Sequence, residues 1–333
     1  MIKNILFLCL FSVTFSNIIQ AQAIKKRVTK ESVEQTVITS FSGDLAYETT
    51  AFVEQYWRVV GNTGFNESIF FIAKHLENAG FVLEEKSKPN NRLTYRIEKR
   101  PLKNPTWEMV DALITFNSKE APLLAYKTNR NMVALNSYST PKEGVSAEVV
   151  YVKDVQKLKK MDVKGKIVFA ETSPSRIYND AIVNGGAIGL MTYDNPSYLQ
   201  PEKNTTSIQF RSIPLNSKLK PWAIALSYQA KERLKEALLK GPITLHVQIE
   251  TKIYESEELT IVADIKGNKL PSERLVFSAH VQEPGANDNA TGVGVALEMA
   301  TLSAKLLQNN TWNPTRTLTF LWGDEIVSTG RYV

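Results

Sequence analysis

The last third of the chain alternates between short apolar runs and one long helical pattern. Apolar and β-branched residues fill Leu259–Ile265, Arg274–Ala279 and Arg316–Trp322, and each run has the length of a single strand. Between the second and third runs, apolar residues that include Val295 recur at helical spacing over Gly292–Leu307. A strand, a helix and another strand in this order predict an α/β sheet with a crossover connection.

The first part of the chain is predicted to be mostly helical. The pattern over residues 32–80 is helical, and it is clearest at 69–79. Asn66 could cap the start of this helix, and Gly80 closes it in the manner of a helix C-cap. Prolines recur over 101–122, which indicates a linker or a crossing between domains.

Residues 121–250 have a different pattern, in which short strand-like runs alternate with short helical ones. Apolar residues occupy every odd position of Ile243–Ile249, which predicts a half-buried strand with His246 on its polar face. Gln229–Leu239 is predicted to be an amphipathic helix that ends at Gly241. We therefore predict a β-rich domain in this region of the chain.

The first apolar run lies at the amino terminus. A single basic residue, Lys3, precedes the apolar stretch Ile5–Phe11, and Ala21–Ala23 offers a small-residue cleavage site. This arrangement is typical of a secretory signal peptide, here residues 1–23, so we expect an exported protein. An uncleaved membrane anchor is the alternative, but the stretch is short for a span and we expect no stable anchor. The one cysteine, Cys9, lies in this run, so the mature chain would contain no disulfide.

The composition is that of an ordinary globular protein. Of the 333 residues, 43% are hydrophobic and 22% are charged, which excludes a disordered or fibrous chain. The formal net charge of +6 is mild, and the basic clusters at 25–27 and 157–160 are short, with acidic residues nearby. We therefore expect no nucleic-acid partner.

Polar side chains that could carry chemistry follow the strands of the predicted α/β part. His280 ends the second strand, and Asp288 lies in a Gly- and Asn-rich loop before the helix. Asp324 and Glu325 directly follow the third strand. One histidine and several carboxylates at neighbouring strand ends form a ligand set suited to Zn²⁺. Successive side chains of an extended segment point to opposite sides, so Glu325 can bind metal while Asp324 takes a proton from water.

These segments resemble a known enzyme family. Ser278–His280, Gly285–Gly292 and Gly323–Glu325 are similar to motifs of the co-catalytic zinc aminopeptidases, the family of secreted bacterial leucyl aminopeptidases. Some members carry an inserted protease-associated domain, which Asp162–Phe169 and Ala181–Met191 resemble. The resemblance implies an exopeptidase that uses two Zn²⁺ ions and acts on peptide or protein substrates.

The resemblance also implies a role for each candidate residue. His280 corresponds to a ligand of one zinc, Asp288 to the carboxylate that bridges both, and Glu325 to a ligand of the other. Asp324 takes the place of the general base. The family usually has Asp where this chain has Gln282, and Glu where it has Asp324.

The expected fold class is α/β, with a partial mixed-sheet zinc peptidase domain and an inserted β-rich, protease-associated-like domain. We expect a signal peptide at 1–23, a helical segment and crossing at 24–120, the insert at 121–250, and the first part of the peptidase domain at 255–333. The family has a further Asp and a further His ligand downstream. We therefore expect this chain to be the N-terminal portion of a longer enzyme, inactive by itself.

Three alternatives to an aminopeptidase stay open. A non-catalytic, peptidase-like ectodomain could bind protein through its insert, which the departures at Gln282 and Asp324 would permit. A carboxypeptidase or a glutaminyl cyclase of the same fold would differ in the loops that select the substrate. Zinc content separates the enzymes from the binding protein, and the sequence does not indicate an oligomeric state.

Overall fold

The computed structural model describes residues 30–116 and 121–332. The contacts within the chain divide it into two compact units, Met1–Thr39 and Ser40–Val333. Helix α1 (Lys30–Ser40) begins in the first unit, and the predicted signal peptide lies outside the described residues. All candidate site residues belong to the second unit, which contains two larger sheets.

A mixed five-stranded sheet carries the candidate site residues. Strands β12 and β14 are parallel, while β11 is antiparallel to both β14 and β3. The short strand β2 lies at the edge and is parallel to β3. The α/β prediction with a mixed sheet is therefore confirmed. In order across the sheet, the strands are β12 (Leu270–His280), β14 (Arg316–Gly323), β11 (Glu257–Ile265), β3 (Leu93–Pro101) and β2 (Val82–Leu83).

Helix α6 (Thr291–Gln308) connects the parallel strands β12 and β14 and packs against them. Val295 is 42% exposed, although the sequence pattern predicts that it is buried. It lies about 200° around the helix from Val293 and from Leu297, which face the core. The buried residues of the helix are Val293, Gly294, Ala296, Leu297, Glu298, Ala300 and Ala304.

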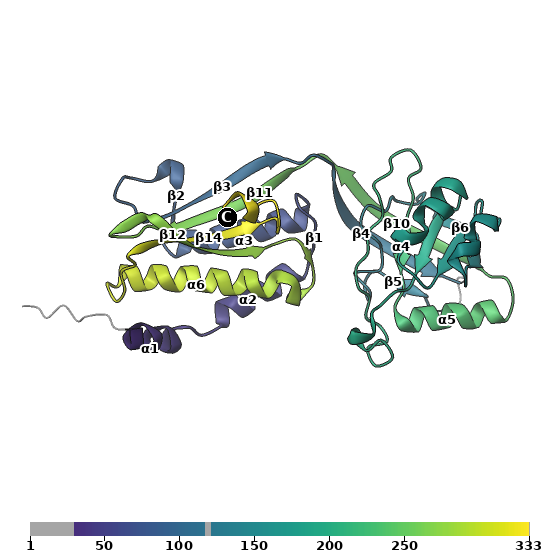
Figure 1. The fold of residues 1–333 in the computed structure, drawn as a ribbon, viewed down its shortest axis with the longest axis horizontal. Helices are drawn as coiled ribbons and strands as arrows, with labels where there is room; N and C mark the ends of the chain where they lie inside the picture. Colours follow the sequence, from purple (N-terminus) through teal and green to yellow (C-terminus); the bar gives the residue numbers. More distant parts are fainter. Residues whose placement is uncertain (1–29, 117–120, 333) are drawn as a thin grey trace, which may run out of the picture. The chain divides into compact units, whose positions relative to one another are not determined.

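Helix α2 (Asp44–Glu54) lies beside α6 (Figure 1). The carboxylate of the buried Glu298 on α6 accepts hydrogen bonds from the backbone N–H groups of Ser42, Gly43 and Ala46, so it caps the amino-terminal end of α2.

Ala286–Gln308, which includes α6, is long and apolar enough to cross a membrane by length and composition, and 44% of its apolar window is buried.

The predicted helical pattern over 32–80 is broken into separate elements. Between α2 and α3 (Thr63–Asn78) lies the short strand β1 (Trp57–Arg58). The side chain of Asn62 accepts a hydrogen bond from the backbone N–H of Phe65 at 2.9 Å, so Asn62 caps α3 and not Asn66. The helix begins earlier than its apolar spacing indicates because the cap lies before its first apolar turn.

The second sheet has seven strands and contains most of the predicted insert. It also includes β4 (Thr106–Thr115), which lies inside the predicted crossing at 101–122. The chain does cross between the two sheets here, from Pro101 at the end of β3 to Thr106 at the start of β4. The residues after Thr106 are not a linker, because β4 pairs with β10. The strands in order are β5 (Leu124–Ala125), β4, β10 (Thr244–Tyr254), β6 (Val145–Tyr151), β7 (Ile167–Ala170), β8 (Gly189–Thr192) and β9 (Ala223–Ala225).

The alternating pattern of β10 is confirmed. Leu245, Val247 and Ile249 are buried, while the imidazole of His246 lies on the other face and contacts the hydroxyl of Ser146 at 2.9 Å. The predicted amphipathic helix is α5 (Tyr228–Leu239). The remaining helical segments of this region are the helix α4 (Pro174–Tyr178) and short turns at Val155–Lys160, Asn179–Asn184 and Ser197–Leu199.

Candidate metal centre

The carboxyl ends of two parallel strands bring the candidate residues to one edge of the five-stranded sheet. His280 is the last residue of β12, and its register partner on β14 is Gly323. Asp324 and Glu325 follow Gly323 directly. The prediction that these strand ends are neighbours is therefore confirmed.

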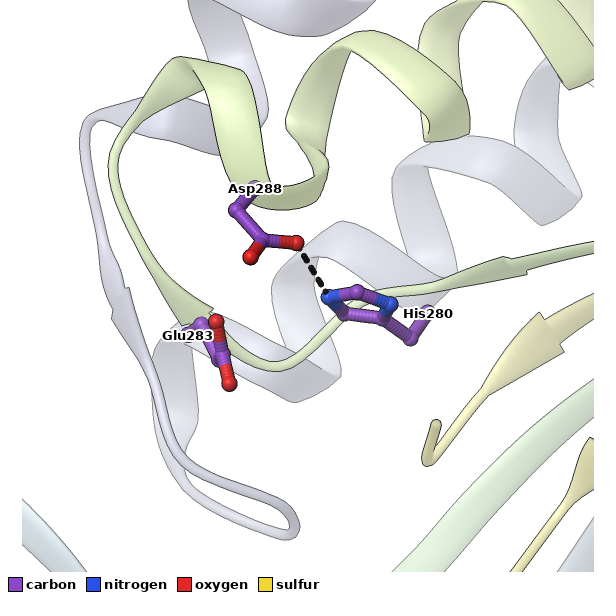
Figure 2. Close-up of side chains that lie close together, drawn as sticks. All are labelled: His280, Glu283 and Asp288. Carbon is purple, nitrogen blue, oxygen red and sulfur yellow. Dashed lines mark ion pairs between the residues drawn. The ribbon is translucent and has the colours of Figure 1, made fainter. Parts of the chain in front are cut away.

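The loop after β12 brings a carboxylate close to the imidazole of His280. The short strand β13 (Glu283–Pro284) pairs with β1, and the turn Ala286–Ala290 then leads into α6. The turn places the carboxylate of Asp288 against His280, with Oδ1 3.0 Å from Nε2 (Figure 2). The side chain of His280 is 13% exposed and that of Asp288 is 68% exposed, so solvent reaches this pair from the carboxylate side.

Glu283 completes a group of three side chains that could hold a cation. One ligand atom from each of His280, Glu283 and Asp288 lies within 4.8 Å of the others. Figure 2 shows Glu283 on the loop between the other two residues. Our sequence analysis missed Glu283, although an acidic residue three positions after a candidate histidine ligand is a signal that could have identified it.

The histidine nitrogen that faces these acids is left without a hydrogen bond. Nε2 of His280 is buried and has no hydrogen-bond partner, because its approach to Asp288 lacks hydrogen-bond geometry. A buried polar atom without a partner is costly, and coordination to a cation would satisfy it. One imidazole nitrogen and two carboxylates are ligands that Zn²⁺ accepts, so the residues fit this metal.

The local charge also favours a cation. Burial raises the pKa of the Glu283 carboxyl, and the nearby charges of Asp288 and Glu325 raise it further. His280 and Arg58 act in the opposite direction but do not reverse the shift. A carboxyl whose ionised form is disfavoured by burial and by other acids gains from a bound divalent cation, which supplies the missing positive charge.

Asp324 and Glu325 lie outside this group of three. The chain turns directly after Gly323, so the argument from an extended segment does not apply to this pair. Oδ1 of Asp324 accepts hydrogen bonds from the backbone N–H groups of Ile326 at 3.0 Å and Val327 at 2.7 Å, which makes it the cap of the turn. The metal and base roles of Glu325 and Asp324 stay predictions.

The side chain of Gln282 joins the two strand ends. Its Oε1 accepts a hydrogen bond from the backbone N–H of Glu325 at 3.0 Å. The contact holds the segment after β14 against the loop after β12. Glu325 is therefore attached to the loop that carries Glu283, even though its own carboxylate is not part of the group.

Comparison with known proteins finds a family model that matches part of the chain. Residues 260–325 match Peptidase family M28. This M28 segment runs from β11 to the residues after β14, so it contains every candidate site residue named above.

Two curated proteins are similar over a longer range. Carboxypeptidase Q of Xenopus laevis is 25% identical over 260 residues, which are 69% of this chain and 50% of that protein. Carboxypeptidase Q of Bos taurus is 24% identical over 280 residues, or 76% of this chain and 54% of that protein. The chain thus spans about half the length of the curated relatives that it matches.

Solved structures share the fold. The aminopeptidase from Aneurinibacillus sp. strain AM-1 aligns with a TM-score of 0.52 and 20% identity, over 90% of this chain and 67% of that one. BSAP, a zinc aminopeptidase from Bacillus subtilis, aligns with a TM-score of 0.56 and 17% identity, over 88% of this chain and 64% of that one. The Peptidase M28 precursor from Shewanella amazonensis aligns with a TM-score of 0.55 and 17% identity, over 91% of this chain and 69% of that one. The fold of mixed α/β sheets is therefore similar to that of these peptidases.

Proposed function

We propose that the chain belongs to an exported, zinc-dependent exopeptidase of the aminopeptidase type. The observation that carries the proposal is the convergence of His280, Glu283 and Asp288, with an unpartnered imidazole nitrogen, inside the segment that matches Peptidase family M28. Export rests on the signal-peptide pattern at residues 1–23.

In this proposal His280 and Asp288 would hold one zinc ion, and Asp288 and Glu325 would hold a second. Glu283 is close enough to act as a further ligand of the first ion. Bound zinc supplies a Lewis acid that polarises the scissile carbonyl and lowers the pKa of water. Asp324 would accept the proton of the attacking water and pass it to the leaving amine.

The seven-stranded sheet is proposed to be a protease-associated-like domain that shapes access to the centre. A cavity of about 210 Å³ is lined by Trp57 and Gly285 on one side and by Arg130 and Ile208 of the second sheet's region on the other. Limited proteolysis tests the domain. Since β4 belongs to this sheet, a stable fragment should begin before Thr106, and cleavage near residue 121 should destroy it.

A carboxypeptidase is the second candidate, because both curated relatives named above are called Carboxypeptidase Q. The two activities differ in which end of a peptide the substrate must leave free. Aminoacyl p-nitroanilides report the first activity. Dipeptides with a blocked amino terminus and a free carboxylate report the second.

The experiment uses the protein expressed from its complete reading frame, with zinc measured by atomic absorption and turnover measured on both substrate types. We expect two equivalents of zinc and hydrolysis of the p-nitroanilides, both of which are lost in His280→Ala. The matched control is Glu273→Gln on the same strand, where an exposed carboxylate pairs only with Arg316 among the described residues. Zinc with activity on blocked dipeptides alone would favour the carboxypeptidase, and absence of zinc would favour a non-catalytic binding protein.

A further inference from the structure

A fully buried arginine lies behind the loop that carries the candidate ligands. Arg58 is 0% exposed, and its guanidinium donates four hydrogen bonds, all to main-chain carbonyl groups. Nη1 donates to Val53 at 2.7 Å and to Tyr56 at 3.0 Å. Nε donates to Val281 at 2.6 Å, and Nη2 donates to Gly285 at 3.1 Å.

The acceptors belong to two segments that are far apart in the sequence. Two of them lie around the end of α2, and the other two, Val281 and Gly285, lie on either side of Glu283. Arg58 is also the strand partner of Glu283 in the β1–β13 pair. One side chain therefore fixes both ends of the loop 281–285, between His280 and Asp288.

Arginine suits this position because of the shape of its charged group. The planar guanidinium directs its donors along fixed directions, whereas a lysine ammonium is a single donor atom on a flexible stem. Among the described residues, no carboxylate lies within ion-pair distance of Arg58, so carbonyl groups accept all the hydrogen bonds of its guanidinium. Burial lowers the pKa of Arg58 to about 10, and the charges of Glu54 and Glu283 act against that shift. The side chain is therefore still charged at neutral pH.

We propose that Arg58 is a positioning residue of the metal centre. By holding Val281 and Gly285, it sets the path of the loop and so the separation of the ligand atoms of His280, Glu283 and Asp288 before metal binds. The inference rests on the proposed function, since it assumes that these residues bind zinc. Residues that orient metal ligands typically change metal affinity by about 10- to 100-fold when they are replaced.

Arg58→Lys keeps the positive charge but cannot reproduce the four directed hydrogen bonds. The matched control is Arg211→Lys in the second sheet's region. Arg211 also donates four hydrogen bonds, to Asp194, Gln209 and the carbonyl of Phe210. Both variants should lose stability, but only the first should affect the metal centre.

The measurement is Zn²⁺ affinity of the protein from the complete reading frame, by competition with a chelator at a temperature well below unfolding. We expect Arg58→Lys to lower the affinity by about 10- to 100-fold and to change the visible absorption spectrum of the Co²⁺-substituted protein. Arg211→Lys should match the wild type in both. Wild-type affinity and spectrum in a destabilised Arg58→Lys would overturn the role of Arg58 and leave the proposed function standing.

A wild-type protein that binds no Zn²⁺ would overturn the metal centre itself, and the role of Arg58 with it. If Arg58→Lys does not fold, the unaltered protein still decides the question by NMR of the arginine Nε–H groups. Because Nε of Arg58 donates to the residue that follows His280, its signal should shift when Zn²⁺ is added. The signal of Arg211 should stay in place, and an unshifted Arg58 signal in zinc-loaded protein would contradict the proposal.

Discussion

The two larger sheets of the second unit both place polar side chains where parallel strands end, but the two groups differ in how completely their charged side chains are paired. In the seven-stranded sheet, Glu171 follows β7 and accepts a hydrogen bond from Tyr151. It also pairs with Lys235 at 3.0 Å and with Lys231 at 3.8 Å. The ammonium of Lys231 lies over the ring of Tyr193 as well, 4.4 Å from its centroid. Every charge in this group has a partner within the protein.

The group at the end of β12 is paired less completely, although Oδ1 of Asp288 lies 3.0 Å from Nε2 of His280. Nε2 of His280 has no hydrogen bond, and the nearby negative charges of Asp288 and Glu325 disfavour ionisation of Glu283. The pKa values of Glu283 and Glu171 shift in opposite directions. Burial raises the pKa of Glu283 and no partner reverses the shift. Burial acts in the same direction on Glu171, but the hydrogen bonds from Tyr151 and Lys235 outweigh it and lower the pKa of that carboxyl.

The comparison shows how a structural polar cluster differs from a candidate site. Charges that satisfy one another stabilise and rigidify a fold. Charges that are left unsatisfied reduce stability, and they persist where a ligand can compensate for them. The following variants test this distinction, from the largest expected effect to the smallest.

Replacing His280 by Ala should have the largest effect. It removes the only nitrogen ligand of the group of three, so zinc content should fall to background and turnover should be lost. Zinc is measured by atomic absorption and turnover on the same preparations. The control is His246→Ala on β10, whose imidazole contacts the hydroxyl of Ser146. A His280→Ala protein that keeps its zinc would contradict the assignment of the site.

Asp324→Asn should keep zinc and lower turnover by about 10²–10⁴-fold, the usual cost of removing a general base. The asparagine retains an Oδ1 that can accept the hydrogen bonds from Ile326 and Val327, so the turn should persist. Glu325→Gln should lose both zinc and turnover. The opposite pattern, with zinc lost only from Asp324→Asn, would mean that the two roles are exchanged.

Glu283→Gln and Glu171→Gln compare the two groups directly. We expect Glu283→Gln to weaken zinc binding by at least about tenfold, as for residues that support a metal site. Glu171→Gln should leave zinc binding unchanged and lower the free energy of unfolding. Chelator competition measures the zinc affinity of both variants, and urea denaturation measures their free energy of unfolding. If Glu283→Gln bound zinc as tightly as Glu171→Gln, Glu283 would not belong to the candidate site.

The smallest expected effect is the pH dependence of stability that Glu171 contributes. The pKa of this carboxyl is lower in the folded protein than its ordinary value of 4.5, so its stabilisation is present above that pH and is lost as the pH falls through the folded pKa. Since a third of the side chain is exposed, we expect about 1 kcal/mol between wild type and Glu171→Gln at neutral pH. The difference should shrink as the pH falls below 4.5 and through the folded pKa, and a constant difference would contradict the assignment.

The local pattern of the sequence determined much of the fold. Strict alternation predicted the strand that became β10, and apolar runs predicted β11, β12 and β14, because burial of one face imposes a period on the residues themselves. The order of strand, helix and strand predicted the parallel pair. That pair places His280 beside Gly323, so the location of the candidate site at this edge also followed from the sequence.

Other features were decided only by tertiary contacts. Strand β4 joined the second sheet by pairing with β10, more than 130 residues later, which the prolines around it did not indicate. Glu283 entered the site because β13 pairs with β1. Asp324 became the cap of a turn. In the sequence Arg58 is an ordinary charged residue, yet in the fold it is buried and donates hydrogen bonds to carbonyl groups of two distant segments. Hydrogen bonds of this kind form between groups that have no shared period in the sequence, so only the folded chain brings them together.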